Sequence, residues 1–200
     1  MTPDDALATL LLATRNLVSA TPALSDFVGD GLERLAYIRP SPRDLPITDR
    51  LVALMPMAGP NTAELTFATL AAAPHLTWQQ SYTEAQVGAH FLANYGWFNL
   101  VSPDGPYATD ALRVSVGYWE QGLTYPPHRH APEEIYCVLA GSARFDTEGR
   151  DPVMATPGTL IHHTPNHLHG FSMADAPLLA VAFWRGNNLT APSHLDPAVP

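Results

Sequence analysis

The second half of this 200-residue chain consists of short strand-like segments that are broken by Gly, Pro and Asp. Apolar or alternating runs of about four to eight residues between such breaks indicate β-strands. The expected strands span residues 77–82, 96–101, 112–119, 134–139, 142–147, 152–154, 159–162, 169–173 and 178–184. Many short strands at close spacing are typical of an antiparallel sandwich or barrel, so this half is predicted to be all β.

The first 75 residues differ, because their apolar residues recur near helical spacing. Helices are expected over residues 4–17, from about 22 to 37, over 46–55 and over 62–73, with a Pro-rich joint at 39–46. The sequence therefore predicts a helical segment 1–75 packed on a β domain 76–186, followed by an irregular tail 187–200. Three roles stay open for the helical segment: a lid over a site, a homodimer surface, or a brace.

The charge balance disfavours some classes of partner. The chain has 10 Lys and Arg against 19 Asp and Glu, a formal charge of -9 that repels phosphate backbones and anionic membranes. No run approaches the ~20 apolar residues of a spanning helix, and the N-terminus lacks the basic start of a secretory signal. We therefore expect a cytoplasmic protein without nucleic-acid or membrane partners. The single cysteine, Cys137, excludes an intramolecular disulfide and is expected to be a buried hydrophobe.

Residues 122–141 carry the clearest chemical pattern. Side chains alternate faces along extended backbone, so His128 and His130 point the same way, and Glu134 and Tyr136 share their parity. Two imidazoles and a carboxylate on one face suit a borderline divalent ion such as Zn, Fe(II), Mn or Ni. Taken alone, two histidines near a Glu are equally compatible with surface polar residues after a Pro-Pro turn.

The complete spacing of this segment is more specific than its histidine pair. It resembles the first cupin motif throughout, on Gly122, His128, His130, Glu134 and Gly141. The resemblance implies a cupin fold, which is a double-stranded β-helix or jelly-roll barrel. It also implies one divalent metal, with Zn, Fe(II) and Mn as the candidates.

A second cupin motif supplies the fourth metal ligand. Pro157-Gly158 is followed by Pro165 and then by His169, although the Pro stands one residue later after the Gly than is usual. The resemblance makes His169 the ligand that joins His128, His130 and Glu134. His163 and His167 share the parity of His169 and are expected to face inward behind the ligands, whereas His162 has the opposite parity.

Two tyrosines narrow the resemblance to one group of cupins. Tyr125, three residues before the first histidine, and Tyr136, two after the glutamate, together with the ligands resemble the cupin-type dimethylsulfoniopropionate (DMSP) lyases. Those enzymes cleave DMSP to dimethyl sulfide and acrylate. The cleavage requires removal of a proton alpha to a carboxylate, and a tyrosinate near a cation is a plausible base. The resemblance supports Tyr136 as that base, with Tyr125 as the second candidate.

The sulfonium of DMSP needs a site that tolerates positive charge, and aromatic faces supply one. Candidate aromatic residues on the expected strands are Trp97, Phe98, Trp119, Phe171, Phe183 and Trp184. From these we predict substrate contacts at Trp97, Trp119, Phe171 and Trp184, with His163 added. Two alternatives remain open: a cupin dioxygenase of a small substrate using Fe(II), and a non-catalytic, metal-bound cupin that binds a small molecule. A sugar isomerase is disfavoured by the shortage of Lys and Arg.

Overall fold

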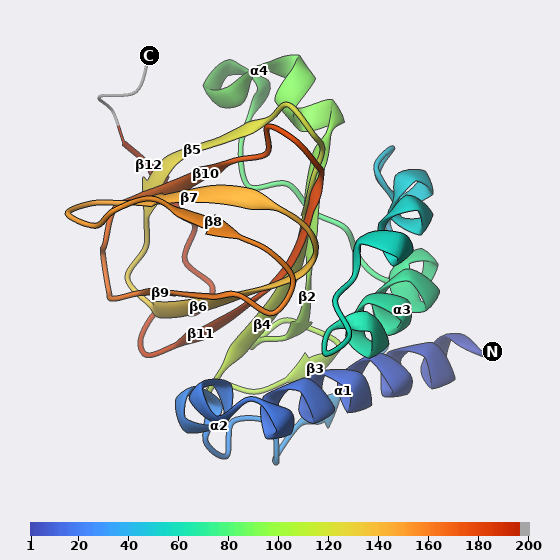
Figure 1. Cartoon of the computed structure of the whole chain (residues 1–200). Helices are drawn as coiled ribbons and strands as arrows, with labels where there is room; N and C mark the ends of the chain where they lie inside the picture. The colour runs from blue at the N-terminus through green and yellow to red at the C-terminus, as the bar shows by residue number, and fades with distance from the viewer. Residues whose placement is uncertain (197–200) are drawn as a thin grey trace.

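A computed structural model of the chain describes residues 1–196, in which a layer of helices lies against one of two β-sheets (Figure 1). The helices are α1 (Pro3–Ala20), α2 (Pro22–Val28), η1 (Thr48–Met57), α3 (Ala63–Ala72), η2 (Ala73–His75) and α4 (Glu84–Ala93), where η denotes a 3-10 helix. The strands are β1 (Ala36–Tyr37), β2 (Tyr95–Val101), β3 (Tyr107–Ala108), β4 (Arg113–Trp119), β5 (Thr124–Arg129), β6 (Glu133–Gly141), β7 (Ala143–Thr147), β8 (Val153–Ala155), β9 (Leu160–His163), β10 (His169–Ser172), β11 (Leu178–Arg185) and β12 (His194–Leu195).

The strands form a seven-stranded sheet in the order β1-β3-β2-β4-β11-β6-β9 and a five-stranded sheet in the order β12-β5-β10-β7-β8. From β4 onward the chain passes back and forth between these sheets, so that strands far apart in sequence become neighbours. This is the jelly-roll arrangement of cupins, and the predicted fold class is confirmed. Within residues 1–196 the strands pair as two sheets rather than as one continuous hydrogen-bonded barrel.

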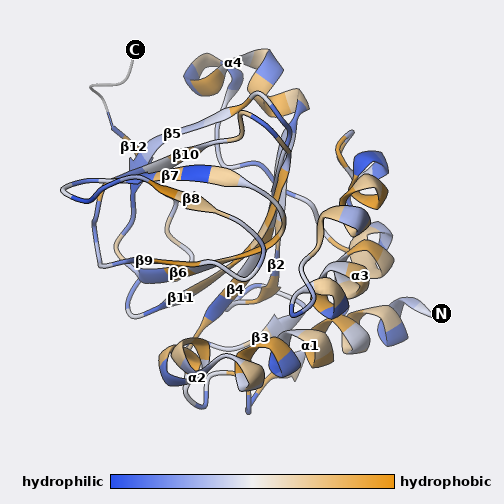
Figure 2. Ribbon diagram, in the orientation of Figure 1, coloured by the Kyte–Doolittle hydropathy of each residue, from blue (hydrophilic) through white to orange (hydrophobic). Residues whose placement is uncertain are grey.

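The N-terminal helices brace the outer face of the larger sheet. Helix α1 begins with a capping box between Thr2 and Asp5, and Pro3 occupies its first turn, where its missing N–H costs nothing. Its buried side chains, among them Leu7 and Leu10, join one apolar cluster with α3 and with the outward residues of the sheet. Figure 2 shows hydrophobic and hydrophilic residues interspersed along α1, as expected of a helix with one buried face.

The second helix is shorter than predicted. It ends at Val28 rather than near Tyr37, because Gly29 takes a positive φ of 54° and ends the helical backbone. Residues Ala36–Tyr37 instead form β1, which pairs with β3 at the edge of the larger sheet. Among the described residues no single helix is long and apolar enough to cross a membrane, although α1 and α2 pass that test together as a pair bent by 113°.

The segment before β2 also differs from its prediction. Residues 77–82 do not form a strand and make only isolated bridges, such as the one between Gln79 and Trp97. Helix α4, which follows, was missed. A capping box of Thr83 and Gln86 marks its start, but Gly88 has a non-helical φ of 80° and leaves no long periodic face to recognise.

The tail after residue 186 is more ordered than predicted. Leu189 is buried, and β12 pairs with Arg129 and His128 of β5. The last residues of the predicted tail, 197–200, lie outside the described residues. The described tail is thus mostly irregular but packs against the β domain through Leu189 and β12, and its residues 190–193 help to enclose the pocket described below.

Candidate active site

Four buried side chains meet between the two sheets. His128 on β5 stands opposite His169 on β10 in the smaller sheet, and His130 follows directly after β5. Glu134 reaches the same place from β6 of the larger sheet. Each of the four side chains is at most 2% exposed. The structure thus brings together the four residues that the sequence singled out as metal ligands.

The donor atoms of this cluster lie close to one carboxylate. Oε2 of Glu134 is 3.0 Å from Nε2 of His130 and 3.2 Å from Nε2 of His169, the second contact lacking hydrogen-bond geometry. The rings of His128 and His169 are 4.3 Å apart. Burial opposes the charge of Glu134, but the neighbouring His130 and His169 outweigh it and hold the pKa of this carboxyl well below its usual range.

Backbone carbonyls orient all three imidazoles. Nδ1 of His128 donates to Pro126 O at 2.9 Å, Nδ1 of His130 to Pro132 O at 2.9 Å, and Nδ1 of His169 to His167 O at 2.8 Å. A carbonyl only accepts hydrogen bonds, so Nδ1 carries a proton in each ring and Nε2 is the nitrogen available to a metal. Burial lowers the pKa of His128 well below its usual value, which keeps that ring neutral. Three imidazoles beside an ionised carboxylate fit a divalent metal, and His128, His130 and His169 can reach one ion.

A fifth buried residue, His163, lies beside the cluster. It pairs with Glu134 across β9 and β6, and its ring stacks on that of His169 with centroids 3.8 Å apart. Neither ring nitrogen has a hydrogen-bond partner within residues 1–196, and one of them lies in reach of an ion shared with Glu134 and His169. Burial lowers the pKa of His163 to about 3. Its neighbours differ: His162 is exposed and pairs with Glu133, while His167 binds the carbonyl of Glu148.

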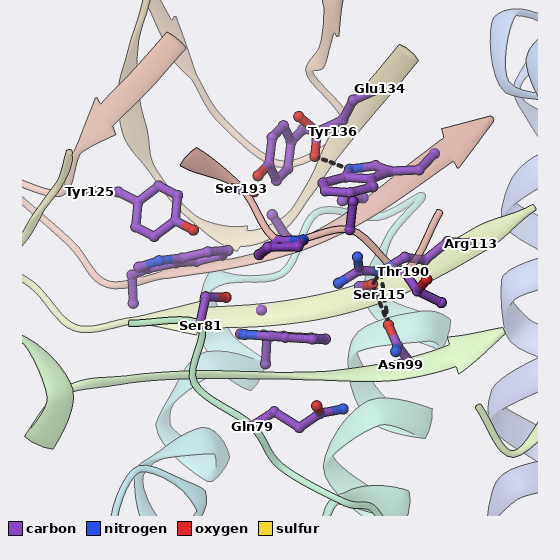
Figure 3. A pocket seen from close by; sticks show the side chains of 18 of the residues that line it. Gln79, Ser81, Asn99, Arg113, Ser115, Tyr125, Glu134, Tyr136, Thr190 and Ser193 are labelled. Atoms are coloured by element: carbon purple, nitrogen blue, oxygen red, sulfur yellow. Dashed lines mark hydrogen bonds between the residues drawn. The ribbon is translucent and has the colours of Figure 1, made fainter. Parts of the chain in front are cut away.

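A pocket of about 240 Å³ opens above the cluster (Figure 3). Five of the predicted residues besides Glu134 line it: Tyr125, Tyr136, Trp97, Trp119 and Trp184. Phe171 lies behind this surface, with its ring stacked on that of Phe145 at a centroid distance of 4.6 Å. His163 lies beside the candidate metal ligands, against His169. A Cβ at Gly117 would stand 2.3 Å from the Trp119 ring, so this glycine makes room for the indole.

Both tyrosines are buried beside the four candidate metal ligands. The ring of Tyr125 is 4.6 Å from that of His128, and its hydroxyl lies 3.1 Å from the hydroxyl of Tyr82. Burial and the nearby Glu134 charge raise the pKa of Tyr136 well above its usual value, and burial does the same to Tyr125. Both phenols therefore keep their protons unless a cation stands close to them.

Trp184 lines the pocket and also contacts two of the four candidate metal ligands. Its Nε1–H donates to Oε1 of Glu134. Its ring stacks on His130 with centroids 4.1 Å apart, and the guanidinium of Arg113 lies 4.4 Å over the same residue. The indole thus orients two of the four candidate ligands, which is the role that second-shell partners play at metal centres.

Sequence reasoning missed the polar wall of the pocket. Arg113, Asn99 and Ser115 lie at the side away from Tyr125, and the chain segments 79–81 and 190–193 contribute the rim (Figure 3). The inward parity of Asn99, Arg113 and Ser115 on their strands was readable in principle. The two rim segments carried no such signal, because their positions depend on contacts between distant parts of the chain.

Comparisons with known proteins show which family the chain resembles over most of its length. The family model of dimethylsulfoniopropionate lyase matches residues 33–180. The dimethylsulfoniopropionate lyase DddQ of Ruegeria pomeroyi is 34% identical over 193 residues, which cover 94% of each protein. Its crystal structure superposes with a TM-score of 0.88 at 33% identity and covers 94% of this chain and 95% of that one.

A second solved structure, from work on the DMSP lyases RdDddP and RnDddQII, superposes with a TM-score of 0.93 at 37% identity. It covers 98% of this chain and 100% of the other. The similarity includes the N-terminal helices as well as the two sheets, because it extends over nearly the whole chain. The chain therefore belongs to the dimethylsulfoniopropionate lyase family.

Proposed function

We propose that this protein is a metal-dependent DMSP lyase, which eliminates dimethyl sulfide from DMSP and releases acrylate. The observation that carries the proposal is the convergence of three Nε2 donors and one carboxylate beside Tyr136 in a small pocket. The volume of about 240 Å³ suits a substrate of a few heavy atoms. The relatives named above supply the substrate class.

The reaction requires three events at the substrate. A base removes a proton from the carbon alpha to the carboxylate, the electron pair of that C–H bond forms the C=C bond, and the C–S bond breaks. The sulfur keeps the electron pair of the C–S bond, so dimethyl sulfide leaves neutral and acrylate keeps the carboxylate. A divalent ion on His128, His130, Glu134 and His169 would supply Lewis-acid stabilisation of the negative charge on the substrate carboxylate.

Tyr136 is the base in this proposal. It lines the pocket from the same strand as Glu134, and its hydroxyl is not engaged with Tyr82 as that of Tyr125 is. Burial raises the pKa of the Tyr136 phenol, so the free site holds it protonated. Because a nearby cation favours tyrosinate, the base becomes active only in the metal-loaded protein.

The test measures dimethyl sulfide in the headspace above purified, metal-loaded protein supplied with DMSP. We expect wild-type activity to disappear after chelation and to fall by about 10²- to 10⁴-fold in Tyr136→Phe, the range for a lost general base. The exposed Tyr37→Phe is the control and retains full activity. Equal release by Tyr136→Phe would transfer the base role to Tyr125, and no release with any of several metals would contradict the lyase assignment.

The two alternatives have less support. A dioxygenase would use the same four ligands, and a binding protein would use the same pocket, but neither is favoured by a specific observation. Oxygen uptake that accompanies turnover would identify the first. Binding of DMSP without release of dimethyl sulfide would identify the second.

A further inference from the structure

The polar wall of the pocket is built around one arginine. Arg113 is 9% exposed, and its Nε donates to Asn99 Oδ1 at 3.0 Å and to Ser115 Oγ at 2.9 Å. Its Nη1 donates to the carbonyl of Leu189 at 3.1 Å, which attaches the tail to the wall. These bonds hold the guanidinium in one orientation, and Figure 3 shows Arg113 at the side of the pocket opposite Tyr125.

This guanidinium has no carboxylate in direct contact, although the charges of Glu134 and Asp104 favour its ionised form from a greater distance. All three acceptors are neutral oxygens, and no carboxylate within residues 1–196 forms an ion pair with it. Besides Glu134, the acidic residue that lines the pocket is Asp104, whose carboxylate already accepts from Ser102 at 2.6 Å and from Asn99 at 3.3 Å. Nη2 of Arg113 makes no hydrogen bond within the same residues. Because buried charges are normally paired, an anion is the missing partner.

The flanking indoles strengthen this conclusion. The guanidinium lies 4.8 Å from the Trp97 ring and 4.4 Å from the Trp184 ring, and Trp184 also stacks on His130. Their faces are thus already engaged with a cation, and a sulfonium placed there would stand beside a like charge. The pocket-lining aromatic residues that remain for the sulfonium are Trp119, Tyr125 and Tyr136 at the other side.

We propose that Arg113 is a substrate-binding residue that sets the orientation of the zwitterionic substrate in the pocket. Its free Nη2–H donates to the carboxylate of the zwitterion, and later to that of acrylate, so that the sulfonium turns toward Trp119 and Tyr125. A carboxylate has lone pairs for several partners, so this contact is compatible with a second one on the Glu134 side. The proposal rests on the proposed lyase function for its substrate, but the anion site itself can be tested without turnover.

The test compares metal-loaded wild type with Arg113→Gln, Arg113→Lys and the control Arg144→Gln, whose arginine is exposed and paired with Asp146. The dissociation constant of acrylate is measured by tryptophan fluorescence. We expect Arg113→Gln to raise it by about 10- to 100-fold, the range for a charge-assisted hydrogen bond. Arg113→Lys restores part of the affinity, and Arg144→Gln leaves it unchanged.

A second arm uses the lyase assay with DMSP and with its cationic methyl ester. We expect Arg113→Gln to raise KM for DMSP more than it lowers kcat. The ratio of kcat/KM for DMSP to kcat/KM for the ester should also fall. A purely structural arginine would lower both activities together. If the Gln variant does not fold, the contact is tested by NMR on wild-type protein that carries ¹⁵N-labelled arginine. The Nε–H resonance of Arg113 should shift when acrylate is added and should not shift when trimethylsulfonium is added.

The two proposals fail in different ways. Unchanged acrylate affinity in Arg113→Gln, or an Arg113 resonance that ignores acrylate, overturns the role of Arg113 while the lyase stands. Absence of dimethyl sulfide from wild type overturns the lyase, while a weaker acrylate affinity in Arg113→Gln still supports the anion site.

Discussion

The two faces of the seven-stranded sheet are both buried, yet they differ completely in chemistry. On β11, Phe183 faces the helices within an apolar cluster, whereas the next residue, Trp184, faces the pocket and donates to Glu134. On β6, Cys137 and Leu139 point outward, while Glu134 and Tyr136 point inward. The same strands therefore supply a brace on one side and a site on the other.

Burial of a side chain therefore does not by itself indicate that the residue belongs to the site. The outer face consists of aliphatic and aromatic side chains, which gain free energy by leaving water. The inner face holds the carboxylate of Glu134, the guanidinium of Arg113 and the imidazole of His163, whose desolvation costs free energy. The outer face thus contributes the stability that the inner face loses, and mutations at neighbouring positions should separate the two effects.

The largest effect on stability is expected at the outer face. Phe183→Ala removes a fully buried ring and should lower the free energy of unfolding by about 3–5 kcal/mol. Folded, metal-loaded molecules should keep their turnover within about twofold, because the change lies on the far face from the pocket. Urea unfolding measures the first quantity, and activity per bound metal measures the second. A large loss of activity in correctly folded protein would contradict the view that the outer face contributes stability alone.

The adjacent position should show the reverse. Trp184→Phe keeps a ring over His130 but removes the N–H that donates to Glu134, so metal affinity should fall by about 10- to 100-fold. The free energy of unfolding should change less than in Phe183→Ala. Competition with a chelator of known affinity measures the metal dissociation constant. An unchanged constant would show that the indole only fills space.

The third expected effect concerns the pH dependence of the stability of the metal-free protein. His128 and His163 have folded pKa values below their usual 6.5, so the unfolded chain binds more protons between the folded and unfolded pKa values. Stability is therefore present above pH 6.5 and falls as pH drops below it, by about 1.4 kcal/mol per pH unit for each such histidine. Glu134 adds to this loss below its usual value of 4.5, because its folded pKa is depressed.

Chemical unfolding of metal-free protein between pH 8 and 5 measures this slope. His163→Phe should flatten it, whereas His162→Gln, next to it on the exposed face, should not. A stability that does not depend on pH over this range would mean that the inner face already admits water or protons.

Features that depend on local spacing could be predicted from the sequence. The distance from His128 to Glu134 and the alternation through Tyr136 follow from backbone geometry within one segment, so their common inward direction was predictable. The requirement for glycine at Gly141 is also partly local, because its φ of 75° favours glycine. The same local logic failed at Gly29 and Gly88, where single glycines interrupted helical patterns.

The surroundings of the candidate metal ligands depend on contacts between distant parts of the chain, so they could not be predicted from the sequence. Arg113 meets Trp184 and the carbonyl of Leu189 across 71 and 76 residues of sequence, and the tail reaches the pocket rim by pairing β12 with β5. These contacts are set by the way the jelly roll folds strands back on one another, and no periodicity within a segment encodes them. A strand pattern tells which way a side chain points. The partner that it meets depends on which distant strand the fold brings opposite.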